Sequence, residues 1–299
     1  MTSFSAALNT PVNFAVPAGA CDCHVHVYLD QARYPMSAKR WYTPPPATEA
    51  ELLDLQRFLG FGRVVIVQPS NYGSDNAATL QGVKFLGLTR ARAVIVIDDT
   101  TTAAELDAYA MAGARGVRLN LALARQVDPA EITHKLFATA KQIEGRGWHI
   151  QVVAKADVLG ALKDTLAALP VPVVIDHFGY APAALGLSQP GFGAIVDLVR
   201  RGTCYVKISG AYRNSTQAPH FADVKPFAQA LIGANPDRIL WGSDWPHPDG
   251  HAENIRPMDI TPNLEIDDGA VLNQLVLWAP DSAIRKKILV DNPARLYDF

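Results

Sequence analysis

The pair His24 and His26 lies at the end of the first apolar stretch of the chain, residues 20–27. Side chains alternate across a β-strand, so two histidines one residue apart project to the same side. Convergent imidazoles can bind a metal ion or a substrate, although such a pair can also cap a loop and bond a backbone carbonyl. A second polar cluster, with Asp244 at its centre, follows a late apolar run. Together the two clusters favour chemistry at strand ends.

Short β-branched runs alternate with segments rich in Ala, Leu, Glu and Lys, and this alternation predicts strands and helices in turn. Because the apolar runs are continuous, they indicate a parallel sheet covered on both faces. Eight βα units match an α/β fold of the TIM type, a (β/α)8 barrel. A doubly wound sheet is the weaker alternative, because no Gly-rich turn follows the first strand. The predicted strands are 21–27, 63–68, 93–97, 116–119, 149–153, 171–175, 204–208 and 238–241. The predicted helices are 48–59, 76–87, 102–112, 129–145, 157–168, 192–201, 223–234 and 281–290.

Composition sets the general class of the protein. The 299 residues are 49% hydrophobic, with a formal net charge of −2 and three cysteines. We therefore expect one globular domain over residues 1–299, with residues 1–19 as an N-terminal extension. Scattered basic residues give a nucleic-acid surface no support, and no apolar run is long enough for a membrane span. The odd cysteine count fits a reducing, cytoplasmic compartment. A homo-oligomer stays open.

Polar residues gather where the predicted strands end. In a barrel of this kind the active site lies at the carboxyl ends of the strands, so these residues are its candidates. Helix caps account for some of them, but three histidines and an aspartate exceed that expectation. The candidates are His24, His26, Gln68, Ser70, Arg118, Asn120, Lys155, Asp176, His177, Lys207, Ser209, Arg213 and Asp244.

Several motifs carry a resemblance to a known family. The His24/His26 pair, His177 within residues 174–179 and Asp244 within residues 241–248 resemble the amidohydrolase superfamily. Residues 68–80, 115–120 and 292–297 are similar to the branch of 2-pyrone-4,6-dicarboxylate lactonase, which includes sugar-acid lactonases and galactarolactone isomerase. The similarity runs nearly end to end. It implies a barrel enzyme that acts on a small anionic lactone.

The resemblance also bears on metal content. Superfamily members with two metal ions carry a bridging Lys after strand four and a His after strand five, where this chain has Arg118 and residues 153–155. A binuclear site is therefore not expected. One Zn²⁺ on the three histidines and Asp244 suits the donor chemistry. The resembled lactonases, however, work without metal, and Arg118 would oppose a dication. We expect no cofactor, with one Zn²⁺ as the alternative.

Lactone opening requires an attacking hydroxyl, a base and donors for the oxyanion that forms. Asp244 is the expected base, and its alternative role is to orient a histidine. We expect His24, His26 and His177 to donate hydrogen bonds to the carbonyl oxygen and to hold Asp244. Each such donor is worth about 3–4 kcal/mol.

Substrate recognition falls to cations and hydroxyls. The resemblance places Tyr42, Ser70, Arg118, Arg125 and Arg213 at positions similar to those that bind substrate in the dicarboxylate lactonase. Guanidinium groups bind carboxylates bidentately, while a surface salt bridge is the alternative for Arg125. A Tyr expected after strand five is replaced by Val153, and Lys155 nearby is a further candidate contact.

Loss of that aromatic partner favours a hydroxylated lactone of a sugar-derived diacid, either hydrolysed by water or isomerised by a substrate hydroxyl. Hydrolysis of 2-pyrone-4,6-dicarboxylate is the main alternative. A Zn-dependent decarboxylase and a non-catalytic barrel that binds acidic metabolites are further alternatives. Retention of all three histidines and Asp244 argues against the non-catalytic barrel.

Overall fold

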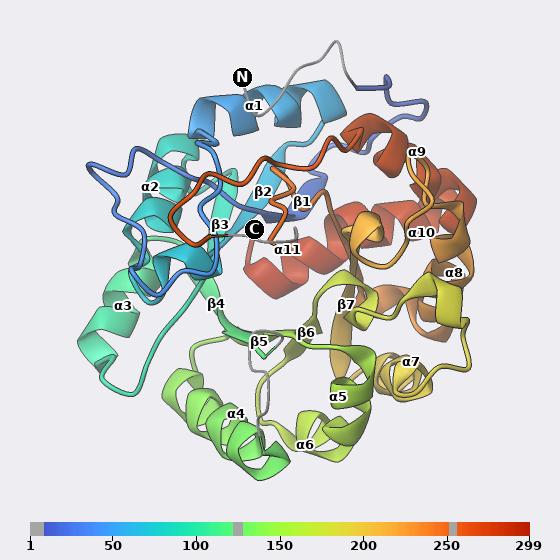
Figure 1. Ribbon diagram of the computed structural model, residues 1–299. Coiled ribbons are helices and arrows are strands. Elements are labelled where there is room, and N and C mark those ends of the chain that lie inside the picture. Colours follow the sequence, from blue (N-terminus) through green and yellow to red (C-terminus); the bar gives the residue numbers. More distant parts are fainter. Residues whose placement is uncertain (1–8, 122–127, 251–255) are drawn as a thin grey trace.

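The strands of the computed structural model, which describes residues 9–121, 128–250 and 256–299, form one parallel sheet. Its order is β1 to β8, with helices arranged around it (Figure 1). The two end strands also meet. The Asp244 amide donates to the His24 carbonyl at 2.9 Å, and the His26 amide donates to the Trp245 carbonyl at 2.8 Å. This seam closes the sheet into the expected barrel.

The strands lie close to their predicted positions. β3 begins two residues earlier than expected, and β1 ends at Val25, so His26 lies just beyond it. Shifts of this size are usual for boundaries inferred from pattern. The bounds are β1 Cys21–Val25, β2 Arg63–Val67, β3 Ala91–Ile95, β4 Ala114–Asn120, β5 His149–Val153, β6 Val173–Ile175, β7 Cys204–Ser209 and β8 Ile239–Gly242.

Local capping explains where several helices begin. Thr48 and Thr102 each form a reciprocal capping box, with Glu51 and Glu105 respectively. The helices are α1 Glu49–Leu59, α2 Ala77–Leu86, α3 Ala103–Met111, α4 Pro129–Ile143, α5 Ala156–Ala161, α6 Lys163–Ala168, α7 Phe192–Arg200, α8 Lys225–Ala234, α9 Asp268–Trp278, α10 Ser282–Lys286 and α11 Asn292–Tyr297.

Three helical segments depart from the expectation. The single helix predicted over 157–168 is two, α5 and α6, which meet at Leu162. The last predicted helix is α10 followed by a π-helical turn, Lys287–Asp291. Helix α9 was not predicted, because five consecutive residues at its start are buried and no amphipathic period shows.

The core has two layers. One lies between the strands and the surrounding helices, and the other fills the barrel interior. Cys21 and Cys23 belong to the interior layer as buried free thiols, which fits small core residues. Leu296 and Tyr297 of α11 belong to the same layer. The C-terminal helix therefore closes the barrel at the end opposite the carboxyl ends of the strands.

Long loops follow the carboxyl ends of β1 and β8, as expected for residues 28–46 and, in the described part of the second loop, 245–250 and 256–263. The two loops pair with each other where the Thr261 amide donates to the Thr43 carbonyl at 2.8 Å. Part of the predicted N-terminal extension packs against α9, since Thr10 bonds Asp267 and Asn13 bonds Asn273.

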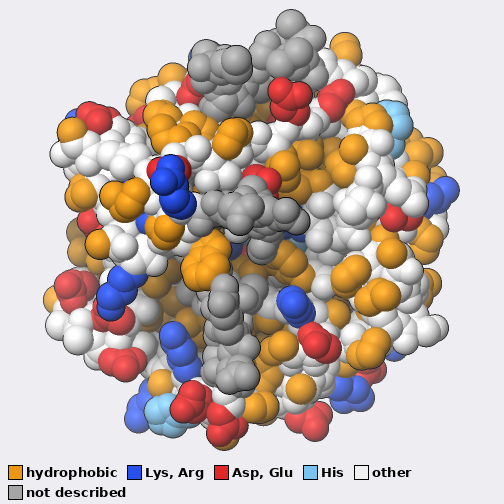
Figure 2. All heavy atoms as spheres, in the orientation of Figure 1, with side chains coloured by type: hydrophobic (Ala, Val, Ile, Leu, Met, Phe, Trp, Pro, Cys, Tyr) orange, Lys and Arg blue, Asp and Glu red, His pale blue; other side chains and the backbone are white. Residues whose placement is uncertain are grey.

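The surface agrees with the near-neutral charge. Lys, Arg, Asp and Glu side chains are interspersed over the face shown in Figure 2. Within the described ranges, no helix has the length and apolar character needed to cross a bilayer.

Candidate active site

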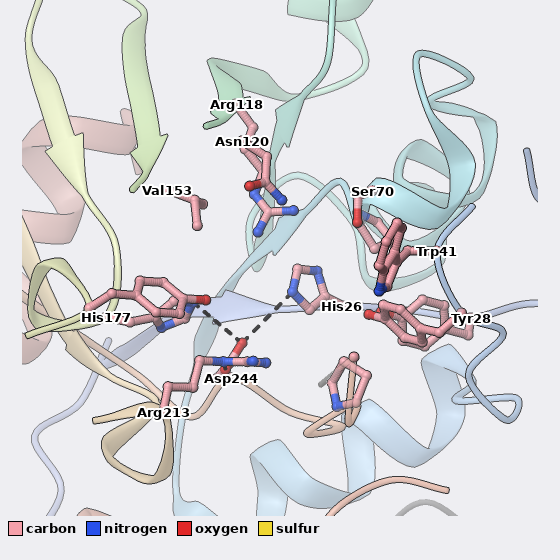
Figure 3. A pocket seen from close by; sticks show the side chains of 15 residues that line it. His26, Tyr28, Trp41, Ser70, Arg118, Asn120, Val153, His177, Arg213 and Asp244 are labelled. Carbon is pink, nitrogen blue, oxygen red and sulfur yellow. Dashed lines mark hydrogen bonds and ion pairs between the residues drawn. The ribbon is translucent and has the colours of Figure 1, made fainter. Parts of the chain in front are cut away.

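The four residues predicted to be catalytic meet at the carboxyl ends of the strands. Figure 3 shows three of them, His26, His177 and Asp244. His24 is in β1 and His26 follows it, His177 follows β6, and Asp244 follows β8. The ring centroid of His24 lies 5.0 Å from that of His26 and 4.5 Å from that of His177. All four side chains are buried. Residues far apart in sequence therefore share one site, as expected.

Asp244 stands at the centre of the cluster. Its Oδ1 lies 3.6, 3.8 and 3.9 Å from the Nε2 atoms of the three histidines. Its Oδ2 accepts hydrogen bonds from Arg213 Nε at 2.5 Å and from the Tyr212 hydroxyl at 2.7 Å. Burial alone would raise the pKa of Asp244, but its surroundings, above all the Arg213 guanidinium, hold that pKa well below its usual range. The carboxylate is therefore ionised.

Strained backbone positions two of these residues. His177 has φ 51° and Asp244 has φ 68°, both in the left-handed region that side chains rarely adopt. Asn214 Nδ2 donates to the His177 carbonyl at 3.1 Å and supports this turn. Gly210 lies so close that an added Cβ would be 2.9 Å from His177 Nδ1. Strain of this kind clusters at functional sites.

Each imidazole is anchored through its Nδ1. The Nδ1 of His26 lies 2.7 Å from the Val67 carbonyl, and that of His177 lies 2.9 Å from Ser209 Oγ. The Nδ1 of His24 lies 3.3 Å from Asp176 Oδ1. These anchors turn the three Nε2 atoms toward Asp244, in the arrangement by which outer groups orient metal ligands.

The protonation of His26 follows from its anchor. A carbonyl only accepts, so Nδ1 of His26 must carry the proton and Nε2 presents a lone pair. Burial lowers the pKa of His26 to about 3 and that of His177 to about 4, so both rings are neutral. A neutral His26 cannot donate to a carbonyl oxygen through Nε2. The donor role expected for this residue does not match the structure.

The donor set fits one divalent metal ion. His24, His177 and Asp244 offer ligand atoms that all lie within 4.8 Å of one another. His24 Nε2 and Asp244 Oδ1 are buried and, among the described residues, make no hydrogen bond. Tetrahedral ligands about 2.0–2.2 Å from an ion lie roughly 3.3–3.6 Å apart, close to the separations around Asp244. Arg118 and Arg213 oppose a dication, but neutral imidazoles and an ionised carboxylate are suitable ligands.

The pocket above this cluster contains most of the predicted substrate-binding residues. Tyr42, Ser70, Arg118 and Arg213 all line it, and so does Val153. Arg118 Nη1 donates to the Gln68 carbonyl at 3.0 Å. Arg213 has a double role that the sequence did not reveal, since its Nε also pairs with Asp244.

One predicted contact among the described residues is not brought to the pocket. Lys155 is exposed and does not line it. The physical reason is that β5 ends at Val153 and α5 begins at Ala156, so strand alternation does not continue to Lys155. Arg125 lies outside the described residues.

Several site residues were not predicted from the sequence. Tyr212 bonds Asp244, Tyr28 and Tyr180 line the pocket, and Gln151 lies beneath it. Gln151 lies within the predicted fifth strand. A polar side chain in that apolar run was the signal that could have marked it as a site residue. The tyrosines lie in loops, where no periodicity indicates direction.

The chain belongs to the amidohydrolase family, whose model matches residues 21–299. It is similar to 4-sulfomuconolactone hydrolase of Rhizobium radiobacter, at 37% identity over 97% of this chain and 94% of that protein. It is 36% identical to 2-pyrone-4,6-dicarboxylate hydrolase of Comamonas testosteroni, over 95% of this chain and 92% of that protein. D-galactarolactone isomerase of Agrobacterium fabrum is 31% identical, over 96% of this chain and 94% of that protein.

Solved structures agree with this family. A crystal structure of an Agrobacterium tumefaciens protein superposes with a TM-score of 0.80 at 29% identity, covering 96% of this chain and 98% of that one. Fold, site and family together show that the chain is an enzyme.

Proposed function

We propose that the enzyme opens the ring of an anionic lactone by attack on the lactone carbonyl. The observation that carries this proposal is Asp244, whose Oδ1 faces three imidazole Nε2 atoms below a pocket lined by Arg118 and Arg213. An ionised carboxylate beside electrophile-binding groups is what acyl transfer to water requires. The three curated relatives, named as lactone hydrolases or an isomerase, support the same chemistry.

Asp244 takes the proton of the attacking water as the new C–O bond forms. Its Oδ2 is fixed by Arg213 and Tyr212, which leaves Oδ1 toward the histidines. Because its pKa is held low, the carboxylate is ionised and can accept this proton. The ring C–O bond then breaks, and the departing ring oxygen receives the proton. The product is a ring-opened hydroxy acid, and the carboxylate is restored.

We propose the single-metal alternative in place of the metal-free site, because the lone pair of His26 Nε2 faces the same point as Asp244 Oδ1. The three histidines and Asp244 would hold the ion. When bound, a divalent ion polarises the lactone carbonyl as a Lewis acid.

The pocket walls suggest the substrate class. Arg118 and Arg213 supply positive charge, and Asp244 offsets only part of it while the histidines are neutral. Guanidinium groups favour carboxylates, so we propose a lactone with two acidic groups. Val153 leaves one wall without an aromatic contact, which supports a hydroxylated, sugar-derived diacid lactone over the flat pyrone.

Ring migration is the second candidate. A substrate hydroxyl would replace water as the attacking group, and the rest of the site would act unchanged. The relative named D-galactarolactone isomerase favours this candidate.

The test is an NMR time course on aldaric-acid 1,4- and 1,5-lactones and 2-pyrone-4,6-dicarboxylate. The wild-type chain is compared with Asp244→Asn and with Asp237→Asn, a matched change at a half-exposed carboxylate that pairs with Lys287. We expect ring opening or migration of at least one diacid lactone, lost about 10²–10⁴-fold in Asp244→Asn and retained in Asp237→Asn. Absence of turnover across the panel, or equal rates in both variants, would overturn the proposal.

A further inference from the structure

A lysine ammonium group lies buried inside the barrel, below the proposed catalytic cluster. Lys207 of β7 is fully buried, and its Nζ lies 2.6 Å from Gln151 Oε1. The same Nζ lies 3.3 Å from His24 Nδ1 and 3.4 Å from Asp176 Oδ1. Three different parts of the barrel therefore converge on one charged group.

Much of the barrel interior is filled by apolar side chains. The neighbour of Lys207 on β8 is Leu240, and Val65, Val94 and Val174 lie in the same interior layer. Burying an ammonium is costly, and replacing a buried ion pair with apolar residues is often neutral or stabilising. A gain in folding stability therefore does not account for the buried pair of Lys207 and Asp176. The contacts of the pair indicate another role.

Gln151 fixes both members of the pair. Its Nε2 donates to Asp176 Oδ2 at 2.8 Å, and its Oε1 accepts from Lys207. An amide that meets an acceptor at one end and a donor at the other has a single orientation. Lys207 and His24 hold the pKa of Asp176 well below its usual range, although burial opposes them. The three side chains thus form a rigid, charge-balanced support.

This support contacts the catalytic histidine whose Nδ1, among the described residues, meets no backbone carbonyl or hydroxyl. His26 is anchored by Val67 and His177 by Ser209, whereas Nδ1 of His24 lies beside Asp176 and Lys207. Its opposite nitrogen, Nε2, lies 3.6 Å from Asp244 Oδ1. The groups that set the protonation of His24 Nδ1 therefore also decide whether Nε2 presents a proton or a lone pair to the reacting atoms.

We propose that Lys207 is a positioning residue for the lactone reaction, acting with Gln151 and Asp176 to set the ring orientation and tautomer of His24. Lys207 does not line the pocket, so in this proposal it acts through His24. The proposal rests on the proposed function for its kinetic consequence, but its structural consequence can be measured without any substrate.

The test uses Lys207→Met and the double variant Asp176→Asn/Lys207→Met, which removes both charges and so avoids a lone buried carboxylate. Lys287→Met is the matched control, because Lys287 also forms an ion pair, at 2.8 Å, but is 40% exposed. Ring nitrogen signals of His24 are recorded in ¹⁵N-labelled, metal-free protein and assigned by their loss in His24→Gln.

We expect the His24 ring signals to move in both Lys207 variants and to stay in Lys287→Met. On a lactone that the wild type opens, kcat should fall about 10–100-fold with KM little changed, as for other groups that orient a site ligand. Unchanged His24 signals in both Lys207 variants would overturn the positioning role. If the wild type opens no lactone, the NMR result still decides, so failure of the proposed function is distinguished from failure of this inference.

Discussion

At the residue scale, the chemistry depends on which atom each side chain presents to the pocket. The sequence indicated that His24, His26, His177 and Asp244 would meet, because HxH and strand-end positions specify direction within a strand. It did not indicate tautomers. The Val67 carbonyl that fixes His26 belongs to a neighbouring strand, and Tyr212 approaches Asp244 from a loop. Contacts of this kind are set by tertiary packing, so no local pattern reveals them.

The role of Arg118 can be tested by changing its shape while keeping its charge. Arg118→Lys should raise KM for a diacid lactone about tenfold, because an ammonium replaces the bidentate guanidinium at a cost of roughly 1.4 kcal/mol. Steady-state kinetics on a diacid lactone and its mono-ester measure the effect. A similar KM change for both substrates would contradict carboxylate recognition by this residue.

The proposed ion can be tested by its removal. Elemental analysis of the purified enzyme should find about one divalent ion per chain, held by histidine and carboxylate ligands as in catalytic zinc sites. Stripping with a chelator should abolish turnover, and adding Zn²⁺ should restore it. His26→Gln should weaken metal retention, since a lone pair at Nε2 is lost. Full activity in stripped protein would reinstate the metal-free site.

At the element scale, strand periods and capping boxes predicted most of the barrel, but helix α9, which lacks a clear polar face, was not predicted. Helix α9 is buried at five successive positions, so the amphipathic signal that identified α1 or α4 is absent there. Lys155 shows the converse error, because alternation was extended beyond the end of β5 into α5. The loop residues of the pocket could not be predicted either, because neither the helical nor the strand period of hydrophobic residues applies to a loop.

Two glycines test the packing of these elements by the same substitution. A Cβ on Gly116 of β4 would lie 2.3 Å from His149 Cε1, so Gly116→Ala should destabilise the fold by about 1–3 kcal/mol. Gly233 of α8 has open space around its Cβ position. There the same change should stabilise by up to about 1 kcal/mol. Urea unfolding of both variants measures the difference, and equal effects would contradict this packing.

At the scale of the whole molecule, buried neutral histidines couple stability to pH. Burial lowers the pKa of His26 and His149 to about 3 and that of His177 to about 4. Below about pH 6.5 the unfolded chain binds protons that the folded chain does not. Asp22 opposes this trend, because burial raises its pKa to about 6.

The three histidines outweigh that one carboxyl. The free energy of unfolding should therefore be full above about pH 6.5 and should fall steadily as the pH drops toward 4. Urea midpoints followed by circular dichroism between pH 8 and pH 4 measure this dependence. A midpoint that stays level or rises on acidification would show that these rings are not buried in neutral form.

The most direct test of the central claim, attack on a lactone carbonyl at Asp244, is turnover in ¹⁸O-labelled water with mass analysis of the product. We expect one label in the new carboxylate of a hydrolysed lactone, or none in a ring-migrated product. Either outcome should be lost together with turnover in Asp244→Asn. Label found on the hydroxyl carbon, or label uptake at the wild-type rate in Asp244→Asn, would contradict the account.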